Sequence, residues 1–224
     1  MLEWKDKSKF LEFIIENEVV GFFEDPLKLK SGRLSTWYVN WRTIAQDAFL
    51  MDQLTDFVIS FVKFLNLTPD CFYGVPEGAT KLGIIAQLKW AREQTNYRKG
   101  TYSLPMGRGK LKEHGDPKDR YYLGEPNGKV IILEDTTTTA GSLITTIKSL
   151  KKLNIEIIAA IVMTERNELR DDGKSVEEIL SEENVKFYTL SNALEIIPLL
   201  KPNEIQSEEI KKYFKKYGTR QIEL

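Results

Sequence analysis

Two adjacent carboxylates, Glu134 and Asp135, directly follow the short apolar run 130–133. Such a β-branched run is typical of a buried strand in a parallel sheet. Ligands of open parallel sheets bind where the strands end. Carboxylates at that edge suit sugar hydroxyl groups, or a Mg²⁺ ion that arrives with a ligand. The pair therefore indicates a candidate ligand site.

A few residues on, Thr138 to Ser142 are small and carry three hydroxyl groups, and Leu143, Ile147 and Leu150 then recur at helical spacing. Backbone N–H groups and the positive end of the helix dipole bind anions at a helix N-terminus. Gly141 would let the backbone approach such an anion closely. The segment predicts a phosphate site, and the alternative is an ordinary strand-to-helix turn with a Ser/Thr cap.

Cationic residues occur in three other segments. Lys30 lies in the hairpin-like stretch 26–41, which is either a surface hairpin or a small subdomain over the site. Arg166 follows the apolar run 155–163, so it is expected at the same edge of the sheet as Glu134, either in the site or as a solvated charge. The Gly- and Pro-rich stretch 105–126 is either a lid or a solvated loop. It carries Arg108, Lys110, Lys112 and His114.

Hydrophobic periodicity predicts the elements that position these residues. Helices are expected at 8–20, ended by Gly21, and at 47–65, 80–93, 176–180 and 203–217. Further strands are expected at 36–41, 71–75 and 185–190. The small-residue loop 74–79 is a second candidate anion loop.

Composition narrows the function classes. The 224 residues are 42% hydrophobic and 29% charged, which is typical of one globular domain with an appendage. A net charge of −1 disfavours a nucleic-acid binder. The single cysteine, Cys71, excludes an internal disulfide. With no long apolar run and a charged N-terminus, a cytoplasmic protein that contacts no membrane is expected.

Three separated motifs carry a family resemblance: Leu29-Lys-Ser-Gly-Arg33 before an aromatic strand, Lys112-Glu-His-Gly115, and the string 133–142. Over about residues 10–190, this order resembles the orotate phosphoribosyltransferases of the type I phosphoribosyltransferase family. The resemblance implies an α/β fold whose mainly parallel, twisted sheet is flanked by helices. It also implies an N-terminal hood at 1–45 and a core at 46–224, with a long mobile loop at about 105–126.

The resemblance implies transfer of the 5-phosphoribosyl group from 5-phosphoribosyl 1-diphosphate (PRPP) to orotate. The products would be orotidine 5′-monophosphate and diphosphate, in pyrimidine (UMP) biosynthesis. Mg²⁺ is the implied cofactor, with no direct protein ligand expected and Asp135 contacting it through water. A homodimer is implied, in which the mobile loop closes over the neighbouring subunit's site.

The resemblance also assigns residues. Catalytic roles fall to Lys112, His114, Glu134 and Asp135. PRPP would contact Arg108, Lys110, Lys112, His114, Glu134, Asp135, Thr136, Thr137, Thr138, Thr139, Ala140, Gly141 and Ser142. Orotate would contact Lys30, Tyr38, Val39, Thr138 and Arg166. The chain departs from the family pattern at Glu134, Val39, Glu77-Gly78 and the order Arg108-Gly-Lys110.

Two alternatives stay open. One is a phosphoribosyltransferase for another base, and the other is a non-catalytic regulator that senses PRPP or a nucleotide on the same fold. The cations Lys30 and Arg166 favour an anionic pyrimidine over a purine. A regulator would typically lack the acidic pair or the loop cations.

Overall fold

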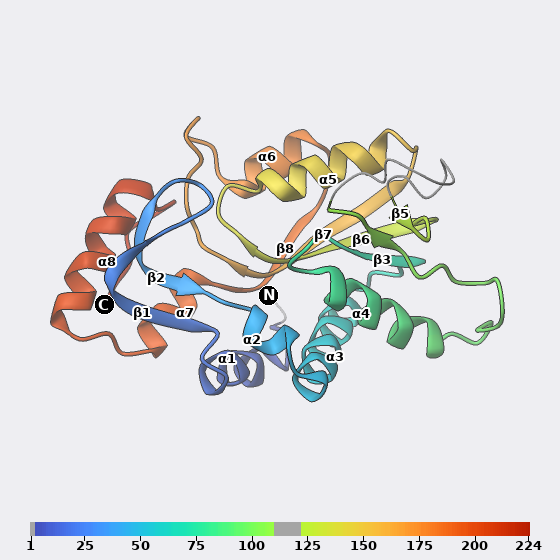
Figure 1. Ribbon diagram of the computed structural model, residues 1–224, viewed down its shortest axis with the longest axis horizontal. Helices are drawn as coiled ribbons and strands as arrows, with labels where there is room; N and C mark the ends of the chain where they lie inside the picture. The colour runs from blue at the N-terminus through green and yellow to red at the C-terminus, as the bar shows by residue number, and fades with distance from the viewer. Residues whose placement is uncertain (1–2, 110–121) are drawn as a thin grey trace.

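The centre of the computed structural model, which describes residues 3–109 and 122–224, is a four-stranded parallel sheet (Figure 1). Its strands lie in the order β3 (Cys71–Gly74), β6 (Lys129–Thr137), β7 (Glu156–Glu165) and β8 (Phe187–Asn192). All three neighbouring pairs are parallel. The carboxyl ends of the strands therefore meet at one edge, as the sequence predicted.

Helices cover both faces of this sheet, and each face has its own hydrophobic core. Alternate residues of β6 divide between the cores, because side chains in a strand point to opposite faces. Ile131 and Leu133 belong to the first core, while Val130 and Ile132 belong to the second. The second core is closed by α5 (Gly141–Lys151) and α6 (Val176–Glu182). The first core is closed by α3 (Ala48–Phe64), α4 (Thr80–Arg92), α7 (Ala193–Leu199) and α8 (Glu204–Tyr217).

The N-terminal segment forms the hood, which consists of α1, β1, β2 and α2. These elements are α1 (Lys7–Glu16), β1 (Val20–Lys28), β2 (Leu34–Val39) and α2 (Arg42–Ala45). The two strands pair antiparallel, and the hood lies beside α8 in Figure 1. Trp37 of β2 stacks on Phe214 of α8 with ring centroids 5.9 Å apart. The hood thus shares the first core with the C-terminal helix.

One helix end differs from the prediction. The sequence predicted a first helix that reaches residue 20 and is ended by Gly21, but α1 ends at Glu16. Glu18 takes a left-handed backbone conformation, with φ of 50°, and Val20 pairs with Val39 in the hood. Strand pairing and burial of Val20 override the apolar periodicity at this point.

The other predicted helices and strands are present with shifts of a few residues at their ends. Two short strands, β4 (Met106–Gly107) and β5 (Tyr122–Leu123), pair antiparallel on either side of residues 110–121. In the part of the chain that the structure describes, no helix combines the length and apolarity needed to cross a bilayer.

Candidate functional site

The elbow, residues 138–142 between β6 and α5, presents backbone donors. Ala140 has φ of 55° and ψ of 20°, a left-handed conformation that turns the chain into the helix. The first helical hydrogen bond of α5 is donated by Ile144 N to Ala140 O, at 2.8 Å. The N–H groups of Gly141, Ser142 and Leu143 have no acceptor among the described residues. These donors and the positive helix end suit an anion such as a phosphate.

The four threonines before the elbow lie in different environments. The hydroxyl of Thr137 is buried and accepts a hydrogen bond from Ala140 N at 3.1 Å, so it holds the turn. The hydroxyl of Thr136 is buried without a partner. Thr138 and Thr139 are half-buried, and the carbonyl oxygen of Thr139 accepts a hydrogen bond from Arg170. Thr137 therefore shapes the loop, while its neighbours remain candidates for ligand contact.

The acidic pair lies within β6, shortly before the elbow in the sequence. Glu134 is only 6% exposed, and its Oε2 atom has no partner. The pKa of Glu134 is raised to about 8, mainly by burial and also by the neighbouring Asp135, while Lys30 opposes the shift. Burial also raises the pKa of Asp135, although its Oδ1 accepts a hydrogen bond from Thr136 N at 2.8 Å.

The loop 74–79 packs against this acidic pair. A Cβ atom on Gly78 would lie 2.5 Å from Asp135 Oδ2, so only glycine allows the observed approach. A Cβ atom on Gly109 would lie 2.6 Å from Glu77 Oε1. The start of the predicted lid segment therefore lies beside the loop 74–79. Lys110, Lys112 and His114 lie outside the described residues, and their roles stay predictions.

Lys30 reaches the elbow from the hood. Its Nζ atom donates a hydrogen bond to Ser142 Oγ at 2.8 Å, across 112 positions of sequence. Its charge also lowers the pKa values of Glu134 and Asp135 against the effect of burial. The structure thus brings the predicted base-side lysine, the predicted phosphate loop and the acids together.

Arg166 lies at the end of β7 and is only 2% exposed, which excludes a solvated charge. Its backbone N–H donates to Thr137 O at 3.0 Å, so the residue adjoins the loop before the elbow. Its guanidinium packs over the Trp37 ring at 3.5 Å from the ring centroid. The Nη1 atom is buried without a partner. Arg166 therefore carries a buried positive charge between the hood and the sheet edge.

Tyr38 and Val39 are adjacent in β2, so their side chains point to opposite faces of the hood. The Tyr38 hydroxyl accepts a hydrogen bond from Arg42 Nη1 at 3.3 Å. Val39 is 5% exposed and packs in the first core. Contact of either residue with orotate stays a prediction.

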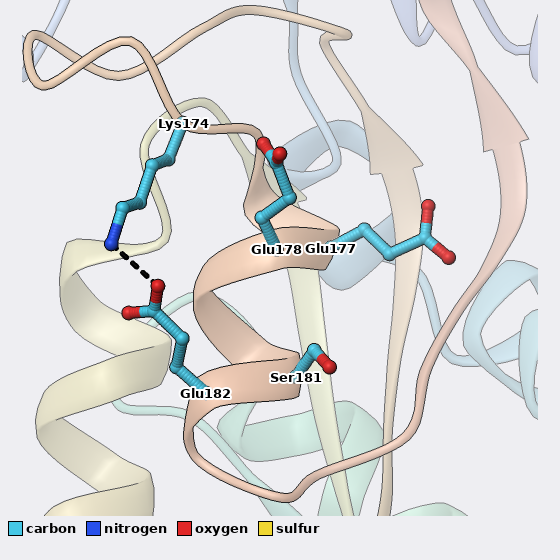
Figure 2. Close-up of a pocket in the computed structure, with 5 residues that line it drawn as sticks. All are labelled: Lys174, Glu177, Glu178, Ser181 and Glu182. Carbon is cyan, nitrogen blue, oxygen red and sulfur yellow. Dashed lines mark hydrogen bonds and ion pairs between the residues drawn. The ribbon is translucent and has the colours of Figure 1, made fainter.

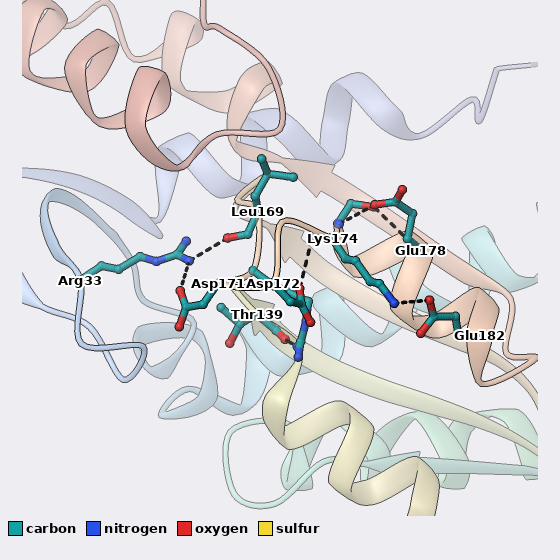
Figure 3. A network of polar contacts seen from close by, with 10 residues as sticks. Arg33, Thr139, Leu169, Asp171, Asp172, Lys174, Glu178 and Glu182 are labelled. Carbon is teal, nitrogen blue, oxygen red and sulfur yellow. Dashed lines mark hydrogen bonds and ion pairs between the residues drawn. The ribbon is translucent and has the colours of Figure 1, made fainter.

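Sequence reasoning gave no role to Arg33, Arg42 and Glu168. Arg33 is buried, and it donates from Nη1 to Glu168 Oε2 at 2.9 Å and from Nη2 to Leu169 O at 2.7 Å. Figure 3 shows Arg33 extending from the hood toward Leu169 and Asp171. Arg42 lies close enough to oppose the raised pKa of Asp135. The only sequence signals were the arginine inside the Leu29–Arg33 motif and the acid two positions after Arg166.

Buried polar atoms without partners gather at this site. Buried side-chain polar groups are normally paired, and each unpaired one costs about 1–3 kcal/mol. Five such atoms occur in the described residues: Ser31 Oγ, Trp37 Nε1, Glu134 Oε2, Thr136 Oγ1 and Arg166 Nη1. All five belong to the hood, to β6 or to the end of β7. This concentration is typical of a site whose ligand supplies the missing partners.

A separate hollow of about 420 Å³ lies on α6 (Figure 2). It is lined by Lys174, Glu177, Glu178, Ser181 and Glu182. Lys174 pairs with Glu182, and Glu178 closes a capping box with Ser175. Its charged groups therefore serve the helix itself, and none of these residues was predicted to bind a ligand.

Known proteins are similar to this chain in sequence. No family model matches the chain. An orotate phosphoribosyltransferase of Rhodopseudomonas palustris is 30% identical over 156 residues, which cover 66% of this chain and 78% of the relative. The corresponding protein of Pyrococcus horikoshii is 26% identical over 186 residues, covering 83% and 90% of the two chains.

Solved structures show the same architecture. The orotate phosphoribosyltransferase of Francisella tularensis matches with a TM-score of 0.69 at 22% identity, covering 94% of this chain and 99% of that one. The Mycobacterium tuberculosis enzyme in complex with PRPP matches with a TM-score of 0.58 at 14% identity, covering 85% and 98%. The hooded parallel sheet with its acidic strand and elbow is thus a type I phosphoribosyltransferase fold. Within that class, the chain belongs to the orotate phosphoribosyltransferase family.

Proposed function

We propose that this protein transfers the 5-phosphoribosyl group of PRPP to orotate, giving orotidine 5′-monophosphate and diphosphate. The observation that carries the proposal is the meeting of Lys30, Arg166 and the acidic pair around the elbow. Family membership supports the same reaction. The bond between ribose C1 and the diphosphate oxygen breaks, C1 bonds to N1 of orotate, and the N1 proton is released.

The elbow is the proposed site of the 5′-phosphate. The N–H groups of Gly141, Ser142 and Leu143 supply donors, and the Ser142 hydroxyl and Lys30 lie 2.8 Å apart beside them. Each charge-assisted hydrogen bond contributes about 1.5–3 kcal/mol. Several such bonds anchor the substrate by the end that does not react, which holds C1 at a fixed place.

Glu134 and Asp135 are the proposed partners of the ribose hydroxyl groups. Breaking the C1–O bond leaves positive charge on the ribose, and a nearby carboxylate stabilises that charge. Asp135 is held by Thr136 N and by the close packing of Gly78. Its position is therefore fixed before the substrate arrives, which is the condition for electrostatic stabilisation.

Orotate carries a carboxylate, and the base side of the site is positively charged. Arg166 offers an unpaired, buried Nη1, and Lys30 extends from the hood. A neutral purine or uracil offers no charge to this buried guanidinium. The arrangement therefore favours orotate over another base. Neither a described residue nor a matched relative favours a non-catalytic regulator.

The diphosphate is proposed to meet Arg108, Lys110, Lys112 and His114 and the loop 74–79. The resemblance supports these assignments, and so does the close approach of Gly109 to Glu77 of the loop 74–79. Closure of the segment would exclude water, which otherwise hydrolyses PRPP.

We propose Mg²⁺ as the cofactor, held mainly by the diphosphate. No cluster of three or more His, Cys, Asp or Glu side chains able to hold a metal occurs in residues 3–109 and 122–224. Mg²⁺ in phosphate sites commonly keeps several waters and takes one or two carboxylates. Asp135, acting through water, fits that pattern. The ion would neutralise charge on the leaving diphosphate.

The remaining assignments follow from the family. We propose a homodimer in which the segment at about 105–126 closes over the neighbouring subunit's site. A place in pyrimidine (UMP) biosynthesis follows from the product. The single buried cysteine, Cys71, fits a reducing cytoplasm.

A direct assay tests the proposal. Orotate loss is followed by absorbance with purified protein, PRPP and Mg²⁺, and uracil, hypoxanthine and adenine serve as control bases. We expect loss of orotate together with release of diphosphate, and no turnover of the other bases. Turnover of a purine alone would contradict the proposal, as would binding of PRPP without turnover of any base.

A further inference from the structure

Glu168 lies fully buried between two buried guanidinium groups. Its Oε1 atom accepts a hydrogen bond from Arg166 Nε at 2.7 Å, and its Oε2 atom accepts one from Arg33 Nη1 at 2.9 Å. Each oxygen of the Glu168 carboxylate therefore accepts a hydrogen bond from a different arginine. The three residues join the loop after β7 to the turn between β1 and β2.

Four side chains hold the guanidinium of Arg166. Nε donates a hydrogen bond to Glu168, and Nη2 donates to the hydroxyl groups of Ser35 at 3.0 Å and Tyr213 at 3.5 Å. The Trp37 ring packs against the guanidinium. The planar fork of arginine fixes where its remaining donors point. Nη1, which lies on the edge of the fork away from Nε, has no partner among the described residues.

The buried charges do not cancel. Arg33 and Arg166 supply two positive charges, and Glu168 supplies one negative charge. Asp171 also pairs with Arg33, at 3.0 Å, but its side chain is 94% exposed and solvent screens it. The cluster therefore keeps an excess of positive charge, which an anionic ligand at Nη1 would neutralise.

We propose that Glu168 is a positioning residue for the base substrate. It holds Arg166 so that Nη1 faces the orotate carboxylate, and Arg33 holds Glu168 in turn. Glu168 itself touches no substrate. This inference rests on the proposed function, because it assigns the free Nη1 to the carboxylate that distinguishes orotate from uracil.

The test compares Glu168→Gln with the wild-type protein in steady-state kinetics. The amide keeps the size of the side chain but removes its charge and one acceptor. Loss of a hydrogen bond to a charged group predicts a rise of about 10- to 100-fold in KM for orotate. KM for PRPP is expected to stay near the wild-type value, since the elbow is unchanged. Glu168→Asp keeps the charge and should give an intermediate KM for orotate.

Asp171→Asn is the matched control. It removes a carboxylate from the same network, but one that is exposed and that contacts only Arg33. Its KM for orotate should stay within about two-fold of wild type. Circular dichroism and a thermal melt establish that each variant is folded. Should Glu168→Gln fail to fold, Ser35→Ala and Glu168→Asp decide the question, because each loosens Arg166 with a smaller change.

The outcomes separate the two proposals. A wild-type protein that does not consume orotate with PRPP contradicts the proposed function. An active wild-type protein with a folded Glu168→Gln variant of unchanged KM for orotate overturns only the positioning role. Equal rises in KM for orotate and PRPP would also overturn it, since they indicate general damage to the site.

Discussion

Burial gives the two neighbouring acids of β6 different chemistry. Glu134, with an unpaired oxygen and a pKa raised to about 8, keeps its proton at neutral pH in the free protein. Asp135 has a backbone N–H to stabilise its charge. The sequence predicted both acids near the carboxyl end of a buried strand, and the structure has them in the last part of β6. It could not separate their protonation, because that depends on neighbours such as Lys30 and Arg42 from distant segments.

Of the two acids, Asp135 gives the more direct test of the ribose assignment, through the substitution Asp135→Asn. Removing the carboxylate takes away the charge that faces the developing ribose cation, so kcat/KM for PRPP should fall by about 10²- to 10³-fold. The amide has nearly the same size, so the fold should persist. Asp172→Asn, at an exposed position of the loop before α6, is the control. Wild-type kinetics for Asp135→Asn would remove this residue from the reaction.

Glu134→Gln should change how stability depends on pH. The folded pKa of about 8 exceeds the ordinary value of 4.5, so the folded protein binds this proton more tightly. The stability that this proton contributes is fully present below pH 4.5 and is lost as the pH rises through 8. The slope is at most about 1.4 kcal/mol per pH unit.

Glutamine does not ionise, so the variant avoids this loss. Its melting temperature relative to wild type should therefore be higher at pH 9 than at pH 5. Thermal melts at both values provide the measurement, with Glu24→Gln as an exposed control. A constant difference between the two pH values would show that Glu134 is not buried as a neutral acid.

Elements that rest on local pattern were predicted well from the sequence. Leu143, Ile147 and Leu150 are fully buried, as their helical spacing indicated. The strand expected at 130–133 is part of β6, one of the two inner strands of the sheet. The prediction from hydrophobic periodicity was wrong where residues distant in sequence determine the local structure. Val20 is an example, because it pairs with Val39 of the neighbouring strand. The burial of Arg33 and Arg166 could not be predicted for the same reason, since Glu168 pairs with Arg33 and Ser35 with Arg166 across more than 100 positions.

Arg33→Ala should destabilise the attachment of the hood. The substitution leaves the buried Glu168 with one cation instead of two, and breaking a buried ion pair costs about 3–5 kcal/mol. Urea denaturation measures the free energy of unfolding. Lys63→Ala removes a half-exposed pair with Glu93 and should cost at most about 1 kcal/mol. Equal losses in the two variants would show that the Arg33 pair is no stronger than a surface pair.

At the scale of the whole molecule, the proposed sharing of the segment at about 105–126 between two subunits makes a specific prediction. Lys112→Ala and Asp135→Asn each damage every site in their own homodimers. In a hybrid dimer with lids exchanged between subunits, one site carries both substitutions and the other carries none. Random pairing of the two chains therefore restores about a quarter of the sites.

Co-expression of the two variants with different tags, followed by an orotate assay of the mixture, measures this recovery. Light scattering of the wild-type protein establishes its mass. Co-expression of Lys112→Ala with the double variant is the control and should recover nothing. Absence of recovery in a proven hybrid dimer would mean that each subunit closes its own site.

The hood is packed too firmly to open as a hinged unit. Trp37 packs against both Arg166 and Phe214, and the buried apolar residues of the hood belong to the first core. Outward movement of the hood would expose these aromatic side chains to water and break the buried ion pair between Arg33 and Glu168. Entry and release of ligands are therefore expected to leave the hood in place.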